Sequence, residues 1–428
     1  MSAPPQPPDH VQLQKKRKRL TFVFWSSCLV LLLIGVLVWF FVLRLRAFTD
    51  DAYVEGNQLF ITPLKKGFVT AIHTDDTFFV KKGQLLVELD TTDALIALDL
   101  TQKQLANQVR EICQAFHQVF AYKAEIESRK AELIRTAQDY KHREDVLAAA
   151  GVSQEDFDHA VAALRSGYFA LKTSEAFYER ALAYVQGTSI TMHPQIQAAA
   201  DQLRNMWVQL YRCKVYAPVD GLVAQRSIQV GMWVNSGHPL MSIIPLDQVW
   251  VNANFKETQM KDMKIGQKVL LTSDLYGDGI VFNGTIVGLP GGAGNAFSLL
   301  PPQNLSGNWI KIVQRLPVRV QLDPNEIKKH PLRIGLSMEA TVDLTDQEGG
   351  LVPTSTEVAP CYRTSIFELE EIGAMEMIEA VIHENLDPTL LTYAHTALSL
   401  KKEDVDTEIK EYLARIGVPL EEFKKTPH

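Results

Sequence analysis

The side chains best suited to catalysis in this chain of 428 residues do not complete a catalytic or metal-binding motif. His383-Glu384 begins like the His-Glu-x-x-His helix of zinc proteases, but Asp387 occupies the position of the second histidine ligand. The glycine-rich stretch 288–304 lacks the Gly-Lys-Ser/Thr that cradles a nucleotide phosphate. We therefore expect no enzyme activity, no metal and no cofactor. We expect 288–304 to be a mobile surface loop that contacts a partner or a neighbouring protomer, or a structural loop without a role.

The cysteines and the charge also narrow the class of protein. Cys28, Cys113, Cys213 and Cys361 are scattered without Cys-x-x-Cys spacing, so we predict free thiols. The formal net charge of −7 is uneven, because residues 346–428 hold 17 acidic and 7 basic residues. The rest of the chain is close to neutral, which argues against a nucleic-acid-binding protein, since such proteins usually present a strongly basic face.

One apolar run near the N-terminus is long enough to cross a membrane. Residues 21–43 carry no charge, and at about 1.5 Å per residue they cover a hydrocarbon core of about 30 Å. The apolar part of a cleaved signal peptide is shorter, about 7–15 residues. Five basic residues precede the run: Lys15, Lys16, Arg17, Lys18 and Arg19. The positive-inside rule predicts one uncleaved anchor with a cytoplasmic N-terminus and the bulk of the chain beyond the membrane.

A long region without glycine or proline, residues 91–149, has the apolar spacing of a coiled coil. Position d is apolar in every heptad: Leu98, Leu105, Ile112, Val119, Ile126, Leu133, Tyr140 and Leu147. Position a holds both apolar and polar residues, and the seam is weakened there by Lys123, Lys130 and Glu144. Sustained spacing of this kind predicts one long helix.

A second seam of the same period follows a break at residues 150–152. It runs from Phe157 to Cys213 and is interrupted at Gly187 and before Pro194. Ser153 is suited to cap the first turn of this second helix. The two seams predict an antiparallel helical hairpin over 91–213, in preference to two ordinary amphipathic helices of a globular bundle.

A small β-rich sequence unit occurs twice, once on each side of the predicted hairpin. GFVTAIHTDDTFFVKKGQLL begins at Gly67, and GLVAQRSIQVGMWVNSGHPL begins at Gly221. Gly83 and Gly237 also match, and the apolar positions agree in the same register. The hairpin would bring the two copies together at its base, where they could close into one small sandwich.

The openings of the two copies, residues 63–67 and 217–221, resemble the half-motifs of a biotinyl/lipoyl domain. Carriers of biotin or lipoate place a modified lysine at the midpoint of one half. Here the midpoints are Asp75-Asp76 and Gln229-Val230, which argues against a swinging-arm carrier. A lipoyl domain split by a helical hairpin resembles the membrane fusion proteins, the HlyD-type periplasmic adaptors of Gram-negative bacteria.

The chain resembles the EmrA subgroup of these adaptors most specifically. The resemblance rests on TDDAYVEGN (49–57), VWVNANFKETQMKDMKIGQKV (249–269), AFSLLPPQNLSGNWIKIVQRLPVRV (296–320) and HPLRIGLSM (330–338). It implies an inner-membrane protein that works with an EmrB-like, proton-driven drug antiporter of the major facilitator superfamily. It also implies a TolC-type outer-membrane channel as second partner, and a homo-oligomer, because one hairpin cannot enclose a conduit.

The resemblance further implies a role for the tip of the hairpin. Many adaptors carry Arg-x3-Leu-x6-Ser at the tip, where it contacts the channel. This chain has Arg143, Leu147 and Ser153, with one residue fewer before the serine, and Gly151 lies in the turn. Either the turn is tighter or Gln154 takes the place of the serine; alternatively, Leu147 is only the last d residue and Arg143 a solvated charge.

After Asp346 the resemblance fades, and the chain becomes acidic. Residues 364–382 have helical apolar spacing, Asp387-Pro388 is typical of a helix start, and Gly417 of a helix end. We expect a small helical appendage that is a solvated decoration, or alternatively a regulatory or partner contact.

The expected fold class is an elongated α+β protein with one N-terminal transmembrane helix and a split lipoyl-like sandwich. The expected divisions are a basic tail (1–20), a transmembrane helix (21–43), a linker and first barrel strand (44–58), lipoyl-like halves (59–90 and 214–245), the hairpin (91–213), a β-barrel (246–345) and the extension (346–428). The expected function is that of a multidrug efflux adaptor. The alternatives are an adaptor of an ATP-driven secretion system and a structural coiled-coil protein of the envelope.

Overall fold

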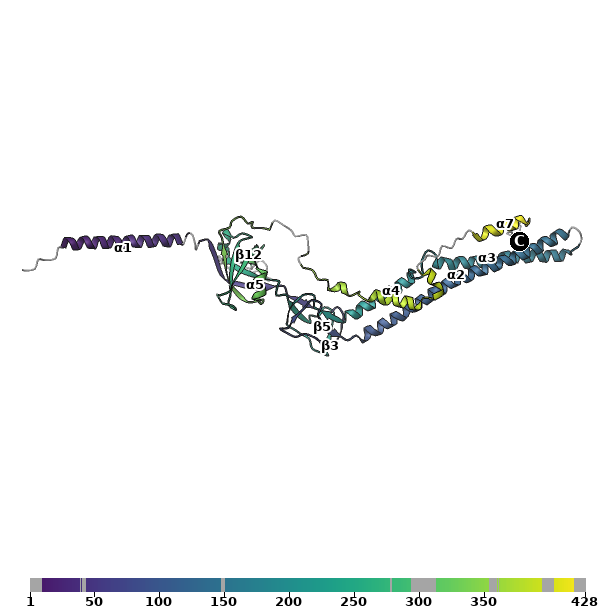
Figure 1. Ribbon diagram of the computed structural model, residues 1–428, viewed down its shortest axis with the longest axis horizontal. Coiled ribbons are helices and arrows are strands. Elements are labelled where there is room, and N and C mark those ends of the chain that lie inside the picture. The colour runs from purple at the N-terminus through teal and green to yellow at the C-terminus, as the bar shows by residue number, and fades with distance from the viewer. Residues whose placement is uncertain are drawn as a thin grey trace, which may run out of the picture.

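The computed structural model describes residues 10–38, 40, 44–147, 151–277, 279–293, 313–353, 360, 362–394 and 404–418. The molecule is elongated, and its parts follow one another from end to end with a bend at the β module (Figure 1). Helix α1 (His10–Val38) stands at one end, followed by a β-barrel, a small β module and a helical hairpin. The expected fold class is confirmed.

Helix α1 is the one described helix that is long and apolar enough to cross a membrane. Its candidate span is Arg17–Val36, 20 residues with a mean hydropathy of 2.0 and no burial against the rest of the chain. A helix whose apolar side chains all face outward would be unstable in water. Length and composition therefore fit a lipid-embedded helix that projects from the barrel.

The barrel is closed by six antiparallel strands in the order β1-β10-β13-β12-β11-β14. They are β1 (Arg46–Gly56), β10 (Val249–Lys256), β13 (Arg315–Leu322), β12 (Val281–Gly288), β11 (Lys268–Ser273) and β14 (Ser337–Asp343). Alternate residues point inward, so Val251, Phe255 and Phe282 are fully buried in its core. The 3-10 helix η2 (Glu257–Asp262) and helix α5 (Pro324–Lys329) connect strands at its ends.

The β module consists of two four-stranded sheets, β2-β9-β7-β4 and β6-β5-β3-β8. The first half contributes β2 (Leu59–Ile61), β3 (Gly67–Ile72), β4 (Phe79–Val80) and β5 (Leu85–Leu89). The second half contributes β6 (Lys214–Tyr216), β7 (Gly221–Ala224), β8 (Trp233–Val234) and β9 (Met241–Ile244). Each sheet therefore contains strands from both halves, and neither half has a sheet of its own.

The hairpin is built from α2 (Thr92–Leu147), α3 (Gln154–Val185) and α4 (Pro194–Tyr211). The 56 residues of α2 make a helix about 84 Å long. The predicted d positions from Leu98 to Tyr140 are all buried. The predicted interruption is present: Gly187 has a φ of 79°, and Pro194 starts α4 after His193 caps it.

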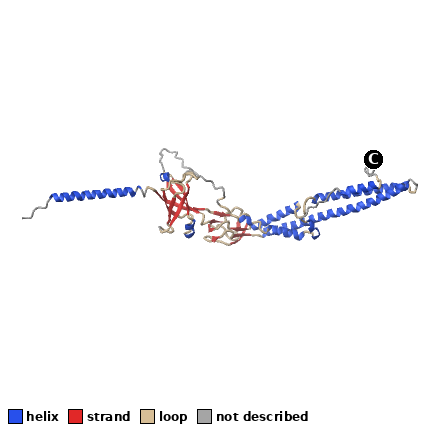
Figure 2. Cartoon of the chain, turned by 45° about the horizontal axis from the view of Figure 1, so that its top comes forward, coloured by secondary structure: helices blue, strands red, loops and turns tan. Residues whose placement is uncertain are grey.

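The C-terminal extension contains η4 (Ile366–Leu369), α6 (Ala374–Asn385), η5 (Pro388–Tyr393) and α7 (Asp404–Arg415). Asp387 is an N-cap as expected, but the helix that it starts is a short 3-10 helix. The expectation of a solvated decoration is wrong, because α6 packs on α2 and α4 and its apolar side chains join the hairpin core. Figures 1 and 2 show the extension lying along the hairpin.

Candidate functional site: the hairpin tip and the split module

The free end of the hairpin is closed by polar contacts between its two helices. The Arg143 Nη1 group donates to the main-chain oxygen of Asp156 at 3.0 Å, and Nη2 lies 3.2 Å from the Asp139 carboxylate. The rings of Tyr140 and Phe157 pack below this contact, with centroids 5.5 Å apart. Arg143 therefore ties the end of α2 to the first turn of α3 and is not simply a solvated charge.

Ser153 sits at the start of α3 as its N-cap. Its hydroxyl accepts from the Asp156 N–H at 3.1 Å and donates to the Asp156 carboxylate at 2.6 Å. The carboxylates of Glu155 and Asp156 complement the positive end of the helix. Because its hydroxyl is engaged in the cap, Ser153 supports the turn, while Gln154 is the first residue of the helix proper.

Leu147 and Gly151 flank residues 148–150, which lie outside the described residues. Leu147 ends α2 and is half-buried. The Gly151 N–H donates to the Val146 oxygen at 3.3 Å, and a Cβ at Gly151 would lie 2.6 Å from Val146 Cγ1. The structure thus brings Arg143 and Ser153 together around Asp156, with Leu147 and Gly151 on the side of the turn. Channel contact by these residues stays a prediction.

In the module, the two halves pair through equivalent residues. Gly67 faces Val234 and Val80 faces Gly221, so each glycine of one half meets the matching valine of the other. The same relation holds for single hydrogen bonds. The Gly83 N–H donates to Ala217 O at 2.8 Å, and the Gly237 N–H donates to Pro63 O at 3.0 Å. The module therefore has an approximate twofold axis that relates the two copies.

Three of the four glycines singled out from the sequence are required by the structure, for two different reasons. Gly83 and Gly237 both have a φ of 80°, a conformation that residues with a side chain rarely adopt. Gly221 is needed for space, because a Cβ there would lie 2.6 Å from Ile243 Cγ2 and 2.7 Å from Ile244 O. At Gly67 the nearest atom, Leu89 Cβ, would be 3.6 Å away, so this position has room for a methyl group.

The midpoint where a carrier domain has its lysine is engaged in a structural contact. The Asp75 carboxylate accepts from Arg226 Nε at 2.8 Å, and the Asp76 carboxylate accepts from the Arg226 N–H at 2.8 Å. The hydrogen bond from Arg226 is the main cause that holds the pKa of Asp75 below its usual value. This turn joins the two halves, and its residues do not offer an attachment point for a lipoyl or biotinyl group.

Two of the strings that point to the family lie side by side in the barrel. TDDAYVEGN forms most of β1 and VWVNANF most of β10, and the strands pair in a register that sets Ala52 opposite Ala253. Asn254 donates to the Asp51 carboxylate at 3.0 Å, and Asp51 also forms an ion pair with Arg315. The shared sequence therefore encodes a polar contact across three neighbouring strands.

Comparison with known proteins agrees with this architecture. A family model described as the EmrA α-helical hairpin domain matches residues 92–213. The probable multidrug resistance protein EmrK of Escherichia coli strain K12 is 42% identical over 340 residues, which cover 79% of this chain and 88% of EmrK. The multidrug export protein EmrA of the same strain is 39% identical over 347 residues, 81% of this chain and 89% of that protein. The fatty acid resistance protein FarA of Neisseria gonorrhoeae is 41% identical over 332 residues, 77% and 82% of the two chains.

The chain belongs to the EmrA family of membrane fusion proteins. Within the described residues of this EmrA-family protein, no group of three or more His, Cys, Asp and Glu side chains could hold a metal ion. Cys28, Cys113 and Cys213 are free thiols, whereas Cys361 lies outside the described residues. Most of the loop 288–304 also lies outside them, from residue 294 onward.

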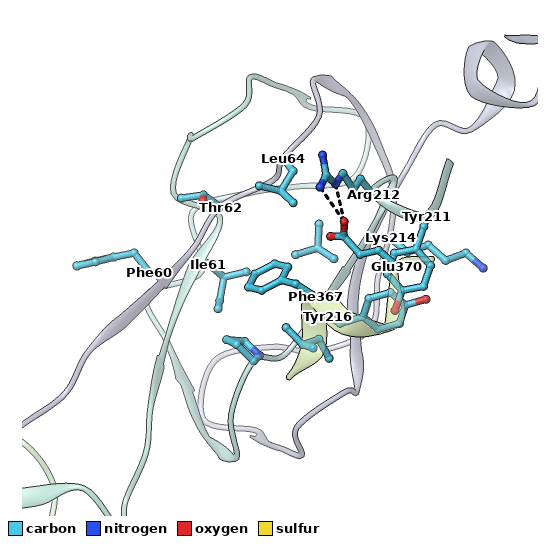
Figure 3. Close-up of a pocket in the computed structure, with 13 residues that line it drawn as sticks. Phe60, Ile61, Thr62, Leu64, Tyr211, Arg212, Lys214, Tyr216, Phe367 and Glu370 are labelled. Atoms are coloured by element: carbon cyan, nitrogen blue, oxygen red, sulfur yellow. Dashed lines mark hydrogen bonds and ion pairs between the residues drawn. The ribbon is translucent and has the colours of Figure 1, made fainter. Parts of the chain in front are cut away.

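The EmrA-family protein has a joint that the sequence did not reveal, where the module, the hairpin base and the extension meet. A cavity of about 170 Å³ opens there between Phe60 and Tyr216 of the module and Phe367 of the extension. Figure 3 shows Arg212 and Glu370 paired at its edge, with Arg212 Nη2 and the carboxylate 2.7 Å apart. The Glu370 side chain is only 8% exposed, so this ion pair is largely shielded from water.

The docking of the extension on the first helix of the hairpin was not predicted either, although the sequence contains a signal for it. Position e of the first helix, next to the d seam, is apolar at Ala106, Cys113 and Phe120. These three residues belong to or pack against the core cluster that includes the extension. A second apolar stripe beside the first indicates a third packing segment, because a two-stranded seam needs only positions a and d.

Proposed function

We propose that the chain is the periplasmic adaptor of a tripartite multidrug efflux pump. In this proposal it links an inner-membrane, EmrB-like proton-driven antiporter to a TolC-type outer-membrane channel. The observation that carries the proposal is the arrangement of one apolar helix at one end of the molecule and the free end of a helical hairpin at the other, with a barrel and a module between them (Figure 1). The names of the EmrK and EmrA relatives, which refer to multidrug resistance and export, support drugs as the transported class.

Three further statements belong to this proposal. The basic residues 15–19 lie before the apolar stretch, which supports a cytoplasmic N-terminus and a periplasmic barrel, module and hairpin. Several copies assemble around one conduit, since a single hairpin has no interior through which a drug could pass. The antiporter supplies the energy, and the adaptor contributes reach, alignment and a seal rather than catalysis.

Drug susceptibility of a deletion strain tests this function. Complementation by the full chain should restore resistance, whereas Leu147→Asp should fail because it places a charge at the end of α2, where this proposal has the hairpin meet the channel. Leu100→Asp is a matched control, because Leu100 is an exposed leucine of the same helix at the opposite end of the hairpin. Both variants must reach the membrane at the level of the full chain.

The outcomes separate the candidate functions. Full resistance with Leu147→Asp would remove the tip from the mechanism. No drug phenotype in the deletion strain, together with loss of a secreted protein and an ATPase gene beside this one, would favour the ATP-driven secretion adaptor. Loss of envelope integrity without any transport defect would favour a structural coiled coil.

A further inference from the structure

The extension lies where the second side of the hairpin is not helical. Helix α3 ends at Val185 and α4 begins at Pro194, so the intervening segment offers α2 no helical partner. Within it, Ile190 is fully buried and His193 nearly so. The main-chain N–H and the hydroxyl of Thr191 both donate hydrogen bonds to the main-chain oxygen of Ala394, at 3.4 Å and 2.8 Å. The end of η5 thus stands directly beside the interruption.

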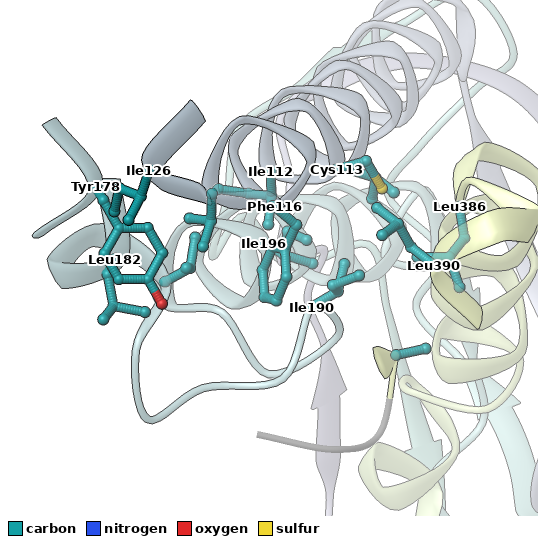
Figure 4. Packing of buried hydrophobic residues seen from close by; sticks show 14 of the residues in the cluster. Ile112, Cys113, Phe116, Ile126, Tyr178, Leu182, Ile190, Ile196, Leu386 and Leu390 are labelled. Atoms are coloured by element: carbon teal, nitrogen blue, oxygen red, sulfur yellow. The ribbon is translucent and has the colours of Figure 1, made fainter. Parts of the chain in front are cut away.

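Apolar packing holds the extension against the hairpin beside the interruption and further toward the tip. Figure 4 shows Leu386 and Leu390 of the extension beside Cys113 of α2, with Ile190 close by. The rings of Phe120 and Tyr393 have centroids 5.2 Å apart. The extension residues of the shared core are Ile378, Val381, Ile382, Leu386, Leu390, Ala394, Ile409, Leu413 and Val418. A run of this length along one core fixes the extension over several helical turns.

Polar contacts set the position of the extension along α2. Arg110 donates to Asn385 at 2.6 Å, and His117 Nε2 lies 2.9 Å from the Asp387 carboxylate. Further toward the tip, Gln138 donates to the hydroxyl of Tyr412 at 2.8 Å. Hydrogen bonds at separated points of one helix define a register, which apolar packing alone leaves open to sliding.

The same extension is also fastened to the module and to the hairpin base. Thr364 donates to Pro218 O at 2.8 Å, and Lys82 Nζ donates to Ser365 at 3.1 Å. Glu370 pairs with Arg212 at the end of α4, as described above. One segment therefore contacts the module, the hairpin base and the interruption in turn.

We propose that the C-terminal extension is a splint that fixes the direction of the hairpin relative to the module and stiffens the hairpin at its interruption. A two-stranded rod bends most easily where one strand loses its helix, because there the remaining helix lacks packing on one side. A third segment that packs on α2 and α4 and contacts the interruption itself removes this weak point. The splint also covers the side of α2 that carries the e positions. Neighbouring hairpins of an oligomer must therefore contact one another through other faces.

Cys113 provides a natural reporter for this proposal. It is buried beneath the extension, and burial raises the pKa of its thiol, which further slows its reaction with a maleimide at neutral pH. Cys213 is buried in the module core and serves as an internal reference in the same molecule. Labelling of the full chain in detergent, mapped by mass spectrometry, reports both thiols at once.

The test compares two adjacent leucines. Leu390→Asp places a charge in the core, because Leu390 is 2% exposed, whereas Leu391→Asp alters a side chain that is 47% exposed. We expect Leu390→Asp to raise the labelling rate of Cys113 at least tenfold and to increase hydrogen exchange in residues 186–193 and in α2. We expect the labelling rate of Cys113 in Leu391→Asp, and that of Cys213 in both variants, to match the rates in the full chain.

Two results would overturn the splint. One is labelling of Cys113 without faster exchange in 186–193, which would make the extension a cover that stiffens nothing. The other is unchanged labelling in Leu390→Asp. If Cys213 also becomes reactive in Leu390→Asp, the labelling of Cys113 and the hydrogen exchange of residues 186–193 are measured instead in a chain that ends at Pro353. The same results then support or overturn the splint. These measurements use purified protein, so they stand apart from any result on drug resistance.

Discussion

At the scale of single residues, the two copies of the β unit are not interchangeable even where their sequences agree. Gly67 and Gly221 occupy equivalent positions, and each begins a strand that faces a valine of the other half. Only Gly221 lies against the backbone of a neighbouring strand so closely that a methyl group would overlap it. A glycine that is identical in the two copies can therefore be sterically required in one copy and replaceable in the other.

This difference predicts opposite outcomes for the same substitution. Gly221→Ala should destabilise the module by about 1–3 kcal/mol, because overpacking forces Ile243 and Ile244 to move. Gly67→Ala should stabilise it by up to about 1 kcal/mol, since alanine reduces the entropy of the unfolded chain. Native-state hydrogen exchange of the β7 and β9 amides measures both. Equal losses in the two variants would contradict the asymmetry.

Asp387 gives the docking of the extension a dependence on acid pH. Hydrogen bonds from Thr389, followed by that from His117, lower the pKa of Asp387 to about 2. A carboxyl whose pKa is lower in the folded state stabilises that state above its unfolded value, 3.8, and ceases to do so as the pH falls toward 2. The protection of α6 amides, corrected for intrinsic exchange, should therefore decline between about pH 4 and pH 2.

Asp387→Asn is the control for that decline. Asparagine keeps the N-cap acceptor but does not titrate, so the decline in α6 protection should be shallower in this variant. Parallel curves for the variant and the full chain would show that other carboxylates cause the decline.

At the scale of elements, the ends of the helices depend on a few caps. At the tip, Ser153 satisfies an N–H of the first turn of α3 that would otherwise lack a partner. We expect Ser153→Ala to cost about 1 kcal/mol of local stability and to speed amide exchange in residues 154–157. Ser153→Asn, which retains an acceptor, should behave like the full chain. Faster exchange in both variants would instead point to the hydroxyl bond with Asp156.

The hairpin could be predicted from the sequence because its signal is long and local. Heptad spacing placed both helices, Gly187 and Pro194 marked the interruption, and N-cap chemistry placed Ser153 at the start of α3. The seat of the extension could not be found in the same way, because apolar residues at position e, such as Cys113, do not say which segment covers them. The exchange of strands between the module halves was equally hidden, since each strand pattern looks complete by itself.

At the scale of the whole molecule, the barrel and the module are joined by two short connections. One lies between Gly56 and Leu59 and the other between Ile244 and Val249. The Asn57 side chain donates to that of Gln248 at 3.0 Å and ties the two connections together. The extension passes beside them, because Tyr362 and Thr364 line a groove with residues 57–59 and Gln248. We expect this additional contact to limit the bending of the joint.

Removal of the extension should therefore loosen the joint without unfolding either part. In a chain that ends at Pro353, the distribution of distances between the barrel and the hairpin base should be wider than in the full chain. Pulsed electron paramagnetic resonance between labels at Leu270→Cys and Ile96→Cys, both exposed positions, measures it in a background with the other accessible thiols replaced. Identical widths would mean that the two short connections hold the joint alone.

The strand exchange in the module has a consequence for biogenesis. Because β2 to β5 precede the hairpin in the chain, they are synthesised before β6 to β9, the strands that complete their sheets. Those strands follow only after the helices of the hairpin, so closure of a long loop must precede formation of the module. The folding of α2 against α3 and α4 shortens that loop, and until then the first half has open strand edges with which other chains could pair.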